Sequence, residues 1–216
     1  MGLILSNDEF CLLEGPVNAP LLVLAHGAGA GFSHEFFQAL VPMLTDEIAV
    51  LRFNFSYMQK MLRLGKRHPP DRLPKLIDAF HEVIPQWPQR VFIGGKSMGG
   101  RVATHVALQR NDISGVIVFG FPFHASGKTL ENRASHFTDL VHPTLIFQGE
   151  RDPFGNYAEI KAYHLSSYVR LCWLKDADHS FIPRKRSGLT QLDHLSSIAR
   201  QVKEFILCRI HHFGVS

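Results

Sequence analysis

A Gly-x-Ser-x-Gly motif at residues 95–99 constrains the fold of this chain more than any other feature. It consists of Gly95-Lys96-Ser97-Met98-Gly99, and it lies between the apolar run 90–94 and the helix-like stretch 100–108. A buried strand, a tight turn and a helix in this order expose the serine hydroxyl at the carboxyl end of the strand. Glycines suit such a turn, because a Cβ atom there would crowd the neighbouring strand and helix. The motif therefore predicts a nucleophile elbow with Ser97 as the nucleophile.

Short apolar runs alternate with helical patterns along the whole chain. Strands are predicted at 3–5, 21–25, 48–53, 91–93, 115–119, 144–147 and 168–173, most of them apolar throughout, as in a parallel sheet covered on both faces. Helices are predicted at 34–44, 73–87, 98–109, 157–163 and 191–210, and a loop at 54–70. The alternation predicts one α/β domain over residues 1–216, built on a doubly wound, mostly parallel sheet.

Length and composition are those of an ordinary globular protein. The 216 residues are 45% hydrophobic and 19% charged, and no apolar run approaches the ~20 residues of a membrane span. The start of the chain lacks the basic region of a signal peptide, although Met1-Gly2 with Ser6 matches the N-myristoylation pattern. Leu3-Ile4-Leu5 suits a first strand equally well. We expect neither a signal peptide nor a membrane partner.

The cysteines and the charge exclude further classes. Cys11, Cys172 and Cys208 are odd in number, widely spaced and in apolar surroundings, which predicts buried thiols in a reducing cytoplasm. The net charge is +4, but the basic residues are scattered apart from 63–67 and 184–186, and neither cluster alternates with aromatic residues. We interpret both as surface loops that attract anions, and we expect no nucleic-acid partner.

The carboxyl ends of the predicted strands carry the candidate chemistry, because ligands bind there in such folds. The first long strand is followed by a glycine-rich loop, 26–31, whose backbone can lie against a carbonyl group. Its Ala28 (or Gly29) amide, together with the Met98 amide, would form an oxyanion hole. A phosphate-binding loop is the alternative, but the run lacks Gly-Lys-Ser/Thr.

Two later strand ends supply an acid and a base. Asp152 follows the strand at 144–147 and could orient an imidazole, or it could merely open a turn before Pro153. Glu150 is the competing carboxylate. His179 lies just past the last strand, within reach of a serine in mid-sheet, and would act as general base. The histidines form no zinc-ligand pattern, so no metal is expected.

The segments 25–31, 94–101 and 177–181 together resemble the α/β-hydrolase superfamily, and the resemblance covers nearly the whole chain. The chain looks most like the small, lidless branch around dienelactone hydrolase. It is also similar to an uncharacterised hydrolase-like group that includes a subunit of nuclear acetyltransferase complexes. The resemblance implies Ser97 as nucleophile, Asp152 as acid, His179 as base, and backbone donors at Met98 and Ala28. The segment between 119 and 144 is too short for a large cap, so an open site is expected.

Gly29, Tyr57 and Arg101 are further candidates for the substrate pocket. Arg101 follows Ser97 by four positions, on the same face of the predicted helix. It forms either a structural ion pair with a carboxylate or a contact with the substrate. In the second case the basic residues at 63–67 would favour an anionic substrate, such as a carboxylated ester.

We therefore expect a serine hydrolase that cleaves a small carboxylic ester or thioester through an acyl-enzyme and needs no cofactor. The main alternative is a hydrolase-fold interaction protein with little or no turnover, since a fold does not fix a function. A peptidase on the same fold and a nucleic-acid-binding module are further alternatives. The acyl group, the leaving group and the oligomeric state are left open by the sequence.

Overall fold

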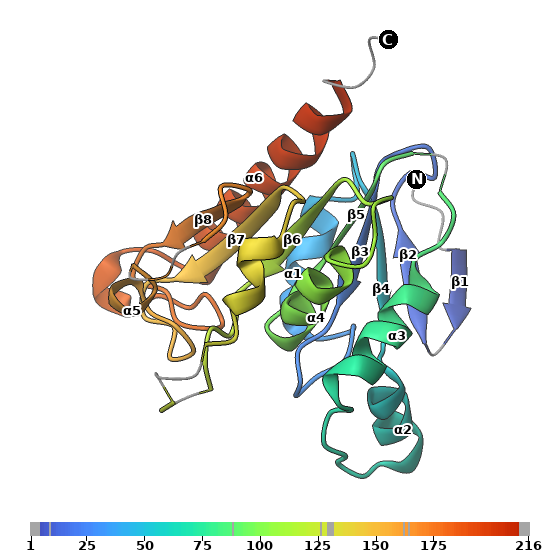
Figure 1. The fold of residues 1–216 in the computed structure, drawn as a ribbon, viewed down its shortest axis with the longest axis horizontal. Helices are drawn as coiled ribbons and strands as arrows, with labels where there is room; N and C mark the ends of the chain where they lie inside the picture. Colours follow the sequence, from blue (N-terminus) through green and yellow to red (C-terminus); the bar gives the residue numbers. More distant parts are fainter. Residues whose placement is uncertain are drawn as a thin grey trace.

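The computed structural model describes residues 5–8, 10–87, 89–125, 127–128, 132–161, 163 and 165–211. Within these residues the strands form one eight-stranded sheet in the order β1-β2-β4-β3-β5-β6-β7-β8 (Figure 1). The strands are β1 Leu5–Asp8, β2 Cys11–Glu14, β3 Leu21–Ala25, β4 Ala49–Phe53, β5 Val91–Lys96, β6 Gly115–Phe119, β7 Thr144–Gly149 and β8 Val169–Leu174. Strands β3 to β8 run parallel, and β2 pairs antiparallel with both β4 and β1. The predicted doubly wound, mostly parallel sheet is confirmed.

Helices cover both faces of the sheet. They are α1 Glu35–Leu40, α2 Ser56–Leu64, α3 Leu73–Val83, α4 Met98–Ala107, α5 Tyr157–Ile160 and α6 Gln191–His211. Short 3-10 helices lie at Val41–Met43, Ser135–Asp139 and Lys185–Ser187. Buried side chains of α2, α3 and α4 join one apolar cluster, and those of α1 and α6 join the other. Figure 1 shows α3 and α4 on the near side of the sheet and α1 beyond it.

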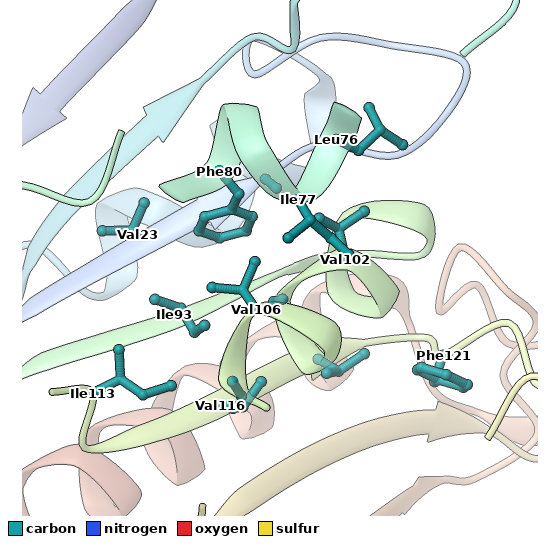
Figure 2. Close-up of a cluster of buried hydrophobic side chains, with 14 of the residues drawn as sticks. Val23, Leu76, Ile77, Phe80, Ile93, Val102, Val106, Ile113, Val116 and Phe121 are labelled. Carbon is teal, nitrogen blue, oxygen red and sulfur yellow. The ribbon is translucent and has the colours of Figure 1, made fainter. Parts of the chain in front are cut away.

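The two apolar clusters explain why the central strands are apolar at every position. Along β3, Leu21, Val23 and Ala25 pack into the cluster beneath α3 and α4. Leu22 and Leu24 point the other way, into the cluster beneath α1 and α6. Successive strand residues face opposite sides, so a strand covered on both faces has no polar alternation. Figure 2 shows the first cluster, with Phe80 of α3 and Val106 of α4 over Val23 and Ile93 of the sheet.

The predicted loop at 54–70 is wrong in its first half, where α2 forms. This helix buries Tyr57 and Met58 against the core and ends at Gly65, whose φ of 61° is left-handed. Glycine is the residue that adopts this conformation without strain at a helix end. Strand β2 is also absent from the prediction. The predicted helix 73–87 ends early, at Val83, because Ile84 precedes Pro85 and is extended, with ψ 108°.

The structure also bears on the predictions for the cysteines, for membrane spans and for a cap. Cys11 and Cys172 are half-buried, whereas Cys208 is exposed on α6, so the prediction of three buried thiols is wrong. None of the helices among the described residues has both the length and the apolar character needed to cross a membrane. The connection from β6 to β7 carries only the helix Ser135–Asp139 in its described part, and no large cap covers this edge. The predicted myristoylation glycine lies outside the described residues.

Candidate active site

Ser97 lies between the end of β5 and the start of α4, in a strained backbone conformation. Its φ of 52° and ψ of −115° are rare for a residue with a side chain. The conformation is fixed on both sides, because the Ser97 amide donates to the Phe119 carbonyl at 3.0 Å and the Arg101 amide donates to the Ser97 carbonyl at 3.0 Å. The turn therefore holds the serine hydroxyl at the carboxyl edge of the sheet.

Glycines flank Ser97 because the elbow packs directly on the end of β3. A Cβ atom on Gly99 would lie 2.3 Å from the Ala25 carbonyl oxygen, and one on Gly95 would lie 2.4 Å from the same oxygen. Both distances are far below van der Waals contact, and the atom met is backbone. The first turn of α4 thus approaches β3 as closely as only glycine permits.

His179 connects Ser97 to Asp152 through two hydrogen bonds. Its Nε2 atom lies 2.9 Å from the Ser97 hydroxyl oxygen, and its Nδ1 atom lies 2.7 Å from Asp152 Oδ2. The Asp152 side chain is fully buried, while 20% of the His179 side chain is exposed. A carboxylate accepts the Nδ1 hydrogen and leaves Nε2 free to accept the serine proton. The three residues follow β5, β7 and β8, which end at the same edge of the sheet.

Among the described residues, three donors hold the Asp152 carboxylate. Besides His179, Gln148 donates to Oδ2 at 3.1 Å, and the Phe154 amide donates to Oδ1 at 2.8 Å. These bonds replace water around the buried carboxylate. The competing carboxylate, Glu150, instead accepts from the Asp176 amide at 2.7 Å. Of the two, the structure brings only Asp152 to His179.

The glycine-rich loop after β3 lies beside the serine. Gly27, Ala28, Gly29 and Ala30 line a cavity of about 390 Å³ together with Ser97 and His179. A Cβ atom on Gly27 would lie 3.8 Å from the Ser97 Cβ atom, which shows how closely loop and elbow pack. Within the described part of the chain, neither the Ala28 nor the Met98 amide donates a hydrogen bond. Ala28 lines the cavity, and Met98 directly follows Ser97 at the start of α4.

His26 and Tyr57 anchor this loop from behind. Buried His26 donates from Nδ1 to the Gly27 carbonyl at 2.7 Å, and its Nε2 accepts from the Phe55 amide at 3.1 Å. Burial lowers the pKa of His26 to about 4, so the ring is neutral and can accept that hydrogen bond. The Tyr57 hydroxyl donates to the Ala28 carbonyl at 3.1 Å. Tyr57 therefore supports the loop and is not among the described residues that line this cavity, whereas Gly29 is.

Arg101 lies apart from the cavity at Ser97. Its guanidinium group is close to His105 and His136, whose rings stack with centroids 3.9 Å apart. Burial, and then Arg101, lower the pKa of His105 to about 4. Arg101 is not among the described residues that line the cavity. In the described part of the chain, no group of three or more His, Cys, Asp or Glu side chains is placed so that it could hold a metal ion.

Lys96 belongs to the site, although the sequence analysis did not single it out. Its ammonium group donates to the His179 carbonyl at 2.7 Å and lies 5.1 Å from the centre of the Phe181 ring. Burial lowers the pKa of Lys96 to about 8, against the opposing charges of Asp152 and Asp178. Lys96 is thus a positioning residue for the loop that carries His179. Its place directly before the motif serine was the only signal in the sequence.

Comparisons with known proteins agree with this fold. A family model described as an alpha/beta hydrolase domain matches residues 18–207. A dienelactone hydrolase from Anabaena variabilis superposes with a TM-score of 0.69 at 20% identity, over 96% of this chain and 97% of its own. Est1E from Butyrivibrio proteoclasticus superposes with a TM-score of 0.67 at 17% identity, over 97% and 99%.

An alpha-beta serine hydrolase homologue from Coxiella burnetii gives a TM-score of 0.66 at 18% identity, over 93% of this chain and 96% of its own. At such identities these likenesses show the fold alone. The expected relation to an acetyltransferase-complex subunit stays a prediction. The family model covers most of the chain, and its range includes both the elbow and the histidine loop. The chain therefore belongs to the alpha/beta hydrolase domain family.

Proposed function

We propose that this protein is a serine hydrolase that cleaves a small carboxylic ester or thioester through an acyl-enzyme intermediate. The observation that carries the proposal is the continuous hydrogen-bonded chain from the Ser97 hydroxyl through His179 to the buried Asp152 carboxylate. Such a chain supplies a nucleophile, a general base and a group that fixes the tautomer of the base. Two further observations support the proposal. The backbone at Ser97 is strained, and the Ala28 and Met98 amides donate no hydrogen bond within the described residues.

The reaction would run in two halves. The Ser97 oxygen attacks the carbonyl carbon while its proton passes to His179 Nε2, and the carbonyl electron pair moves onto the oxygen. The Met98 and Ala28 amides would donate to this oxyanion. When the oxyanion collapses, the alcohol or thiol leaves with the proton from His179. Water then attacks the acyl-serine with His179 again as base, which releases the carboxylic acid and restores Ser97.

The cavity favours a small acyl group. Its volume of about 390 Å³ is at the lower end of the range for small-molecule sites. Phe37 and Phe154 contribute apolar surface beside the serine, and Lys96 contributes a cation. Gly29 remains a proposed pocket residue on this geometry. No cofactor enters the proposed steps.

A serine-directed fluorophosphonate probe tests the proposal against the alternative of an interaction protein. The probe should label the native protein and leave Ser97→Ala unlabelled, because only an activated serine reacts. Turnover of short acyl esters and thioesters should fall in Ser97→Ala by a factor on the order of 10⁶. A folded native protein that resists the probe and hydrolyses none of these compounds would favour the interaction protein.

A further inference from the structure

A second cavity, of about 500 Å³, lies between α2 and the start of α3, and its walls are strongly basic. Its charged lining residues are Lys60, Arg63, Arg72, Lys75 and one acid, Asp71, and His68 also lines it. Lys75 pairs with Asp71 at 2.9 Å, so these two charges cancel. In the part of the chain that the structure describes, no carboxylate forms an ion pair with the remaining lysine and two arginines. The cavity therefore keeps a positive charge of about three with no internal counter-ion.

The positive charge of the whole protein is concentrated at this place. Residues 60–75 hold six of the 23 lysines and arginines but only one of the 19 acidic residues. The remaining 200 residues carry 17 basic and 18 acidic side chains and are nearly neutral. Concentrated like charge destabilises a fold through self-repulsion. A ligand of opposite charge relieves that repulsion.

The cations are arranged toward the cavity by regular structure rather than scattered on a mobile loop. Ser56, Lys60 and Arg63 follow one another at helical spacing on one face of α2. The helix ends at Gly65, which is left-handed, and Pro69-Pro70 restrict the backbone of the segment that connects α2 to α3. Among the described residues, the buried His68 Nε2 atom at this wall has no hydrogen-bond partner. A buried polar nitrogen without a partner is costly and is suited to a ligand oxygen.

Tyr57 connects the lining of this cavity to the lining of the one at Ser97. Tyr57 lines the basic cavity, and its hydroxyl donates to the Ala28 carbonyl at 3.1 Å and approaches the Gly27 carbonyl at 3.4 Å. Gly27 and Ala28 in turn line the cavity that contains Ser97 and His179. The α2 segment follows β4, so both cavities open at the carboxyl edge of the sheet.

From these contacts we propose that the basic cavity between α2 and α3 binds a phosphate-bearing part of the substrate while the acyl carbonyl lies at Ser97. Phosphate is favoured over a single carboxylate because the cavity presents several cations, and because arginine offers paired donors to phosphate oxygens. A volume of about 500 Å³ suits a small-molecule group. The substrate class is therefore an acyl compound, such as a thioester, whose remote end carries phosphate. This assignment rests on the proposed hydrolase function.

The first test measures binding alone. Ser97→Ala protein is titrated with pyrophosphate by calorimetry, with and without the further double substitution Lys60→Gln/Arg63→Gln. Saturable binding should weaken by about tenfold for each of the two charges removed, since a charge-assisted bond contributes about 1.4 kcal/mol or more. Arg200→Glu is the control. It changes the net charge by the same two units on α6, across the sheet, where Arg200 and Glu204 form an exposed pair. It should bind pyrophosphate as Ser97→Ala does.

The second test uses two thioesters that differ in phosphate. Acetyl-coenzyme A carries phosphate groups, and S-acetyl-N-acetylcysteamine presents the same thioester without them. The protein should have the higher kcat/KM for the coenzyme A thioester. Lys60→Gln/Arg63→Gln should remove that preference, so that kcat/KM becomes nearly equal for the two thioesters. Thermal unfolding of each variant checks that the fold is intact.

The outcomes separate the two proposals. Pyrophosphate binding that weakens in the double variant as expected, together with a phosphate preference that disappears in it, supports the assignment. Equal kcat/KM of the native protein for the two thioesters, or pyrophosphate binding of unchanged affinity in the double variant, overturns it while the hydrolase proposal stands. Absence of any turnover refutes the hydrolase proposal, and the pyrophosphate titration still decides whether the cavity binds phosphate. A single-stranded oligonucleotide that binds far more tightly than pyrophosphate, and depends on Lys60 and Arg63, would identify a nucleic-acid surface and overturn the small-molecule assignment.

Discussion

Replacement of Asp152 by asparagine tests the hydrogen-bond network of the site most directly. The change keeps the shape of the side chain and converts one of its two oxygens into an amino group. In the native protein Oδ1 accepts from the Phe154 amide at 2.8 Å, and Oδ2 accepts from His179 at 2.7 Å and Gln148 at 3.1 Å. These three neighbours are all donors, so no orientation of the asparagine side chain satisfies all of them.

Gln148 cannot turn to relieve the conflict. Its Oε1 atom accepts from the Phe121 amide at 2.8 Å, and its Nε2 atom also donates to the Gly155 carbonyl at 3.0 Å. An asparagine whose oxygen faces Phe154 turns its amino group toward His179. His179 must then accept at Nδ1 and carry its hydrogen at Nε2, where it can no longer take the proton of Ser97. The opposite orientation sets the amino group against the Phe154 amide hydrogen.

Two magnitudes follow for Asp152→Asn. One buried donor left without an acceptor costs about 1–3 kcal/mol in the free energy of unfolding, so the variant should still fold. Turnover should fall by ~10⁴, the loss seen when a serine protease is held in the wrong histidine tautomer. That factor corresponds to roughly 5 kcal/mol in the activation free energy. Catalysis should thus suffer far more than stability.

Urea unfolding and the kcat of a short acyl ester measure the two effects separately. Glu150→Gln is the matched control, because its remaining carbonyl oxygen can still accept from the Asp176 amide and it does not contact His179. The control should keep nearly native turnover. Asp152→Asn with turnover within tenfold of the native value would refute the tautomer argument. Loss of turnover in Glu150→Gln in its place would transfer the acid role to Glu150.

Three further changes probe the fold around the site. Gly99→Ala places a Cβ atom 2.3 Å from the Ala25 carbonyl oxygen, so we expect both a lower Tm and reduced ester turnover; a variant with native Tm and turnover would contradict the close packing. Phe80→Ala empties a fully buried position beneath α3 and should lower the free energy of urea unfolding by about 3–5 kcal/mol, and a loss below about 1 kcal/mol would contradict its burial. The folded-state pKa of Lys96, about 8, lies below the ordinary 10.5, so the unfolded chain binds more protons between these pH values and this group adds stability as the pH rises. The unfolding free energy of the native protein relative to Lys96→Met should therefore increase from pH 8 to pH 10.5, and a constant difference would show that the ammonium group is not buried.

The sequence predicts the centre of the sheet well and its periphery poorly, for a physical reason. β3 and β6 have the predicted bounds, because a strand buried on both faces is apolar at every position. β2 has only four half-buried residues, and no long apolar run distinguishes it. In α2 only Tyr57 and Met58 are buried, and no side chain caps its first turn, so the sequence carries no clear signal for the start of this helix. Helices of this kind form through tertiary contacts rather than through their own signal.

The same contrast holds within the candidate site. Ser97, Asp152 and His179 follow strands that the sequence predicts, and parallel strands bring their carboxyl ends to one edge. Gln148 could not be found in this way. Its amide becomes important only because β6 and β7 pair with Phe119 opposite Phe147, which brings the Phe121 backbone to it across 27 residues. A linear pattern carries no information about such register.

The segment after β4 connects the glycine-rich loop to the basic cavity. The Phe55 amide donates to His26, and the Tyr57 hydroxyl donates to the Ala28 carbonyl, so this segment holds the glycine-rich loop from two points. The same segment begins α2, whose exposed face presents Lys60 and Arg63 to the basic cavity. A ligand that draws α2 toward itself must therefore act on the residue that orients the Ala28 backbone. The proposed oxyanion hole depends on that backbone. Phosphate binding in the basic cavity should therefore change how the Ala28 amide is placed against the reacting carbonyl, and binding energy gained far from the ester would then stabilise the transition state.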